Sequence, residues 1–264
     1  DLNRFSLIPL LIASISGALT TWAFYPNEIP LHFDILHQFR LIDLPWYLLL
    51  AIIGGLVSNY FTRTFLYFER KFNQIKNRVT GMFAGALTLG VLIILFPPLW
   101  GEGFRTIKLL INHNTAEITS ENIIGSLMGD YGLMGFMLLL ILLKVIATVI
   151  TIRSGGIGGI FAPSLFTGAI MGFLFAFTLN KTGLIHLSTS NFTLVGMASV
   201  LGGILHAPLT GIFLIAEITR GYELIVPLML TTTIAYITSK KLSPFSIITY
   251  QLAQKGELIT HHKD

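Results

Sequence analysis

The sequence contains no cysteine and very little charge. Only 11% of its 264 residues are Asp, Glu, Lys or Arg, less than half of the about 25% typical of a soluble domain. Without cysteine the chain forms no disulfide and no thiolate metal site. Hydrophobic residues make up 53% of the chain, and the mean hydropathy is +0.75. This composition predicts an integral, multi-pass membrane protein embedded in a lipid bilayer.

The sequence also lacks the signatures of common enzyme and nucleotide sites. It has no Ser-His nucleophile pattern, no P-loop and no dinucleotide fingerprint. The net charge of +4 is modest, so nucleic-acid binding is not expected. His32, Asp34 and His37 form a loose polar set, but without a helical or strand frame their spacing indicates a solvated loop. We therefore expect no enzyme activity, no metal and no cofactor.

Apolar segments broken by Gly and Pro follow one another along the chain. The predicted helices are 5–25, 44–64, 81–95, 104–112, 121–128, 131–152, 163–180, 192–205, 209–219, 222–238 and 245–256. Several, notably Leu209–Thr219, are too short to cross about 30 Å of hydrocarbon. Such segments are tolerated at membrane depth only where protein or a polar cavity surrounds them. The predicted fold class is therefore all-α, a polytopic membrane protein with broken, tilted helices.

Basic residues gather in the segment Arg63–Arg78, at the end of the second predicted helix and before the third. This segment contains a single acid, Glu69, and five basic residues: Arg63, Arg70, Lys71, Lys76 and Arg78. By the positive-inside rule it is predicted to be cytoplasmic. Lys240 and Lys241 suggest that the late helices return to the same side, whereas the Pro26–Pro45 loop is placed outside.

The stretch Arg153–Pro163 combines a glycine run with a proline-marked helix start between two apolar segments. It places the backbone N–H groups of Gly159, Ile160 and Phe161 at a helix N-terminus, with Ala162 and Pro163 opening the helix. These N–H groups and the positive end of the helix dipole attract an anion without a full positive charge. Binding of this kind is weak enough for the ion to leave again. We predict an intramembrane anion site here.

Three polar residues in apolar surroundings each admit two interpretations. Lys144 lies mid-span, where a cation is a functional candidate; alternatively it snorkels, or caps carbonyls of a neighbouring broken helix. For Glu217 a structural role, accepting hydrogen bonds from backbone amides, is favoured over a proton relay. For His206, beside the Ala-Pro-Leu-Thr helix start, an interfacial side chain is favoured over a ligand.

Motifs along essentially the whole chain resemble the CLC family of chloride channels and chloride/proton exchangers. Gly158–Gly168 is similar to the family's G-x-F-x-P segment, and Gly101–Phe104 to its glycine-rich entry to a short helix. Met197–Thr219, continued by Tyr222–Met229, resembles the late paired helices. Ser246–Gly256 resembles the terminal helix leading to the cytoplasm.

The resemblance implies a homodimer in which each subunit has its own pore, built from two inverted repeats. Residues 1–264 resemble the second repeat plus the terminal helix, hence the C-terminal half of the transmembrane domain. The N-terminal half, with its G-S-G-I-P and G-[RK]-E-G-P loops, and any cytoplasmic C-terminal domain would lie outside this chain. The abrupt start at Asp1 suggests a piece of a longer polypeptide. Helices 5–25, 209–219 and 222–238 resemble those of the family's dimer interface, and a bacterial inner membrane is the expected location.

One position departs from the family's pattern. In many relatives the terminal helix begins S-I-Y-T, and its tyrosine hydroxyl coordinates the central anion. Here the string is Ser246-Ile-Ile-Thr249, so Ile248, which cannot donate a hydrogen bond, would line the site beside Gly159, Ile160 and Phe161. Tyr250 lies about 200° further around the helix and is not given the tyrosine's role.

The resemblance implies passive chloride conduction, with proton-coupled chloride antiport as the alternative, because the glutamates that discriminate the two belong to the first half. Two other classes stay open. A membrane-embedded enzyme would use Glu217, His206 and Arg153 as acid/base and phosphate-binding groups, although they are far apart in sequence and lack an adjacent nucleophile. A non-conducting scaffold would give no anion flux.

Overall fold

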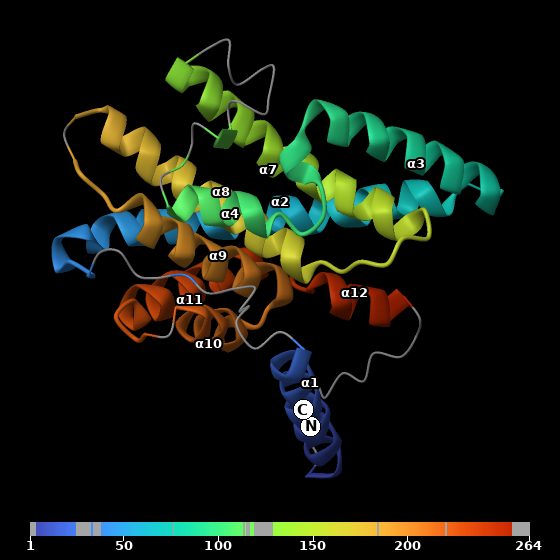
Figure 1. The fold of residues 1–264 in the computed structure, drawn as a ribbon, viewed down its shortest axis with the longest axis horizontal. Coiled ribbons are helices and arrows are strands. Elements are labelled where there is room, and N and C mark those ends of the chain that lie inside the picture. The colour runs from blue at the N-terminus through green and yellow to red at the C-terminus, as the bar shows by residue number, and fades with distance from the viewer. Residues whose placement is uncertain are drawn as a thin grey trace. The chain divides into compact units, whose positions relative to one another are not determined.

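The computed structural model describes residues 4–24, 33, 38–75, 77–112, 114, 117–118, 129–183, 185–219 and 221–254. Within these residues every regular element is a helix (Figure 1), which confirms the all-α prediction. The chain divides into two units, 1–32 and 33–264. The first unit contributes α1 (Arg4–Phe24), an apolar helix. The polar set at 32, 34 and 37 and the predicted helix 121–128 lie outside the described residues.

The helices of the second unit follow the predicted segments, with ends that differ by a few residues. They are α2 (Leu44–Asn73), α3 (Arg78–Leu95), α4 (Phe104–Ile111), α7 (Gly129–Arg153), α8 (Phe161–Lys181), α9 (Thr189–Leu205), α10 (Pro208–Ile218), α11 (Ile225–Leu242) and α12 (Ile247–Gln254), with 3-10 turns η1 (Leu41–Asp43) and η2 (Pro97–Leu99). Among the described residues, three stretches are long and apolar enough to cross a membrane: Leu41–Asn73, Gly129–Arg153 and Phe161–Lys181.

Helix α2 extends beyond the end that hydropathy predicts. It continues through a charged segment to Asn73 instead of ending near Thr64. The charged end is stabilised by the last helices, because Arg63 donates to the Leu242 carbonyl at 3.0 Å and Arg70 donates to the Tyr250 hydroxyl at 2.8 Å. The predicted return of the late helices to the basic end of α2 is thereby confirmed, and its assignment to the cytoplasm stays a prediction.

Helices α8 and α9 cross at very short range because glycines face each other. A Cβ added to Gly172 would lie 2.0 Å from the carbonyl oxygen of Phe192, and one added to Gly168 would lie 2.4 Å from that of Gly196. Small residues of this kind allow helix backbones to approach closely in membranes. As a result α9 is fully enclosed, with every residue from Thr189 to Ile204 buried. A helix enclosed by protein does not have to span the hydrocarbon.

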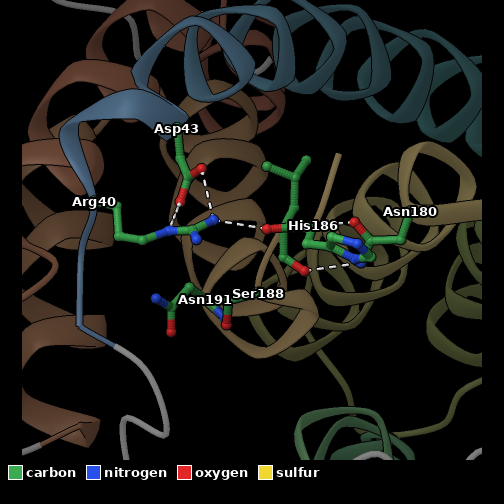
Figure 2. Close-up of polar contacts among 7 residues, drawn as sticks. Arg40, Asp43, Asn180, His186, Ser188 and Asn191 are labelled. Carbon is green, nitrogen blue, oxygen red and sulfur yellow. Dashed lines mark hydrogen bonds and ion pairs between the residues drawn. The ribbon is translucent and has the colours of Figure 1, made fainter. Parts of the chain in front are cut away.

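Polar contacts hold the connection between α8 and α9 against the start of α2 (Figure 2). The Arg40 guanidinium donates to both carboxylate oxygens of Asp43, each at 3.0 Å, and to the His186 carbonyl at 2.7 Å. The Asn180 amide donates to the Leu187 carbonyl at 2.8 Å and accepts from its N–H at 2.7 Å. These contacts fix the C-terminal end of α8 near the start of α2.

Candidate anion site at the start of α8

The first turn of α8 has backbone N–H groups without acceptors. Ile160 is the N-cap residue, and no side chain caps the helix. The first turn closes with the Ser164 N–H donating to the Ile160 carbonyl at 3.1 Å. Pro163 has no N–H. For the N–H groups of Ile160, Phe161 and Ala162 no acceptor lies within the part of the chain that the structure describes. The first N–H groups of a helix need partners from outside it, and here a ligand can supply them.

The glycine run turns the chain tightly from α7 into this helix start. The Gly156 N–H donates to the Thr151 carbonyl at 2.9 Å, and Gly155 has φ +92°, a left-handed conformation that favours glycine. Gly159 faces open space, since nothing lies within 4 Å of the position a Cβ would take. The backbone before α8 is therefore both bare and accessible.

A cavity of about 560 Å³ lies beside the helix start. Four of the predicted site residues line it: Gly159, Phe161, Ala162 and Pro163. The remaining wall comes from the end of α3, the turn η2, the Trp100–Glu102 segment and α7, including Lys144. Ile160 is not in the wall. The cavity thus brings segments far apart in sequence to the start of α8.

Lys144 is buried on α7, with 2% of its surface exposed. Its Nζ donates to the carbonyl oxygens of Leu99 at 3.2 Å and Gly101 at 2.9 Å, and lies 4.4 Å from the centroid of the Phe166 ring. Of the interpretations left open for Lys144, these contacts match the capping of carbonyls beside a broken helix. Lys144 also lines the cavity, so its side chain borders this space in addition to the two carbonyls and the ring.

Ile248 lies on α12 with 50% of its surface exposed and does not line this cavity. Its neighbour Ile247 is buried. The hydroxyl groups of Ser246 and Thr249 lie 2.9 Å apart across the first turn of α12. The Tyr250 hydroxyl accepts from Arg70 and is therefore engaged at the end of α2. A contact of Ile248 with an anion stays a prediction.

A family model described as voltage gated chloride channel matches residues 1–240. The chain belongs to this family. Among solved structures it is similar to a CLC-type fluoride/proton antiporter, with 25% identity and a TM-score of 0.62, over 92% of this chain and 55% of that one. It is also similar in fold to a slow cyanobacterial Cl⁻/H⁺ antiporter, with 20% identity and a TM-score of 0.65, over 96% and 56% of the two chains. The chain thus spans just over half the length of these structures.

The predicted family and the polytopic membrane fold are thereby confirmed for this CLC chain.

The feature that sequence reasoning did not single out is a buried carboxylate near the glycine run. Glu69 on α2 is 3% exposed and forms an ion pair with Arg153, the last residue of α7. The Gln251 side-chain amide on α12 donates to the same carboxylate at 2.8 Å. The one available signal was that Glu69 is the lone acid among basic residues.

Glu217 and His206 have separate surroundings in the CLC chain. Glu217 is exposed at the end of α10, and the expected hydrogen bonds from backbone amides are not found among the residues placed by the structure. His206 ends α9 with φ +55°, and its ring meets the Tyr236 ring edge-on at 5.7 Å between centroids. No cluster of metal-ligating side chains occurs in the described ranges.

Proposed function

We propose that this protein moves chloride or a similar monovalent anion across a membrane. The anion is held by the backbone N–H groups of Ile160 and Phe161, and Gly159 permits its close approach. The observation that carries this proposal is the run of N–H groups without acceptors at a helix start beside a cavity of about 560 Å³. A helix N-terminus attracts an anion through these groups and through the helix dipole.

For the mode of transport we propose passive conduction. Ile248 stands where relatives place a tyrosine hydroxyl on the central anion, so the ion is held less tightly there and coupling to protons is weakened. Proton-coupled antiport is the second candidate, and it is supported by the two similar structures, both named as proton antiporters.

Reconstitution of the complete protein in liposomes, with chloride and pH recorded together, tests both candidates. We expect chloride to leave loaded vesicles without a fixed ratio of protons moving the other way. Uphill proton movement driven by a chloride gradient would replace conduction by antiport. The absence of any anion flux would overturn the transport proposal and leave a scaffold.

Gly159→Val tests the site itself. The open space at Gly159 accepts the side chain, so the variant should fold, but the branched methyl groups cover the backbone that the anion must approach. We expect roughly a tenfold loss of anion flux. Gly135→Ala on α7, which also faces open space, is the matched control and should conduct normally. Equal flux in both variants would place the anion elsewhere.

We further propose that residues 1–264 form the second inverted repeat of a homodimeric, bilayer-embedded transporter of a bacterial inner membrane. Its pore is completed by the N-terminal half of the fold. Dimerisation through helices 5–25, 209–219 and 222–238 is supported by large apolar side chains exposed on α10 and α11, including Phe213 and Met229, since exposed apolar patches mark interfaces. Light scattering of the detergent-solubilised protein should give a dimer mass. A monomer would refute this assembly.

A further inference from the structure

The acid that acts on the buried Lys144 of α7 is Glu102, which is exposed and interacts with it electrostatically without forming an ion pair. The Lys144 side chain donates to two backbone carbonyls and lies over an aromatic ring, and it forms no ion pair with any acid in the described part of the chain. Carbonyl dipoles and the face of an aromatic ring favour the charged ammonium. Both are neutral groups, and the acid that acts on the ammonium is the exposed Glu102.

A buried charge without an ion-pair partner is costly in a protein interior and more so in a membrane. Within a medium of low dielectric constant its field also reaches further than it would in water. A mobile counter-ion in the adjoining cavity lowers this cost. An ammonium has three N–H donors, and two of those of Lys144 are taken by the Leu99 and Gly101 carbonyls. One donor is left for the Phe166 face or for an ion.

Lys144 and the start of α8 line the same cavity. The bare backbone at Gly159 and the first turn at Phe161 form one wall, and Lys144 contributes to another. Glu102 is exposed and is the one acidic side chain in the cavity wall as the described residues define it. The electrostatic balance of the cavity is therefore set by one buried cation, one helix dipole and one solvated carboxylate.

We infer that Lys144 supplies the fixed positive charge that holds a monovalent anion in the cavity beside the start of α8. The helix N–H groups contribute geometry and partial charge, and Lys144 contributes the net charge. This assignment rests on the proposed function, because it presumes that an anion binds at this helix start.

Chloride titration of the complete purified protein by calorimetry, with sodium gluconate replacing chloride at constant ionic strength, tests the assignment. Lys144→Gln removes the charge and keeps an amide donor for the carbonyls. We expect its chloride Kd to rise about tenfold, while Lys144→Arg stays within about threefold of the unmodified protein. A chloride-induced rise in Tm should be lost in Lys144→Gln and kept in Lys144→Arg. Unchanged chloride binding by a monodisperse Lys144→Gln variant would overturn the inference.

A second variant keeps the test decisive if Lys144→Gln does not fold. Glu102→Lys reverses a charge at an exposed position of the cavity wall and leaves the buried amine untouched, so we expect chloride to bind about threefold more tightly. Glu223→Lys, also exposed and absent from the cavity wall, is the matched control and should leave Kd unchanged. Equal Kd values for the two variants would refute the inference. Failure of the unmodified protein to pass anions would instead refute the proposed function.

Discussion

Glu69 on α2 and Lys144 on α7 are buried to the same extent, at 3% and 2% exposure, yet their surroundings differ in kind. Glu69 meets the opposite charge of Arg153 and an amide donor from Gln251. Lys144 meets two neutral carbonyls and an aromatic face. The Glu69 carboxylate and its two partners join α2, α7 and α12 and thereby stabilise the packing of these helices. Lys144, which has no ion-pair partner among the described residues, lines a cavity instead.

The largest expected effect follows from removing the partner of Glu69. Arg153→Met leaves a buried carboxylate without its cation, which we expect to destabilise the protein by about 3 kcal/mol. This is at the low end for buried pairs, because Arg153 is itself one-third exposed. Thermal unfolding in detergent measures the loss, and the double variant Glu69→Gln with Arg153→Met should recover much of it. An unchanged Tm for Arg153→Met would contradict the assigned role of the pair.

A smaller effect is expected when the third member of this cluster is removed. Gln251→Leu deletes a hydrogen bond to the Glu69 carboxylate and should cost about 1.5 kcal/mol. The loss should be local, because Gln251 ties α12 to α2. Limited proteolysis should therefore cut α12 faster than in the unmodified protein. Gln254→Leu, on an exposed face of the same helix, is the control. Equal cleavage rates for the two variants would argue against a role for Gln251 in holding α12.

The smallest change in stability is expected at Lys144. Lys144→Met leaves two carbonyls without a donor but also removes the cost of a buried charge, so the net change in unfolding free energy should be within about 1 kcal/mol. The effect of this substitution should be seen in the chloride-induced rise in Tm, which we expect to be lost. If Lys144→Met were as unstable as Arg153→Met and kept its chloride dependence, the contrast between the two buried charges would fail.

Much of the fold follows from local patterns in the sequence. Hydropathy located the helices to within a few residues because each apolar segment must satisfy its own backbone hydrogen bonds in lipid. Hydropathy predicts that α2 ends at Thr64, but the helix continues to Asn73. Its end is stabilised by contacts with α11 and α12 and not by lipid. Hydropathy does not register such contacts.

One part of the candidate site could likewise be predicted from the sequence, and another part could not. Glycines followed by Phe-Ala-Pro predicted a helix start with free N–H groups, and the structure has it at Phe161. The partners of the two buried charges could not be predicted. The Leu99 carbonyl lies 45 positions before Lys144, and Gln251 lies 182 positions after Glu69.

By itself, the sequence determined that this is an all-α membrane protein of the CLC family, and it predicted a helix start with free N–H groups after the glycine run. Composition, apolar segment length and the glycine-proline pattern depend only on neighbouring residues, and so they can be read directly. Tertiary structure alone decided which buried charge is neutralised and which lines a cavity, because that outcome depends on which distant segments pack together. The close crossing of α8 and α9, the return of α12 to α2 and the capping of carbonyls after α3 by Lys144 are all long-range contacts.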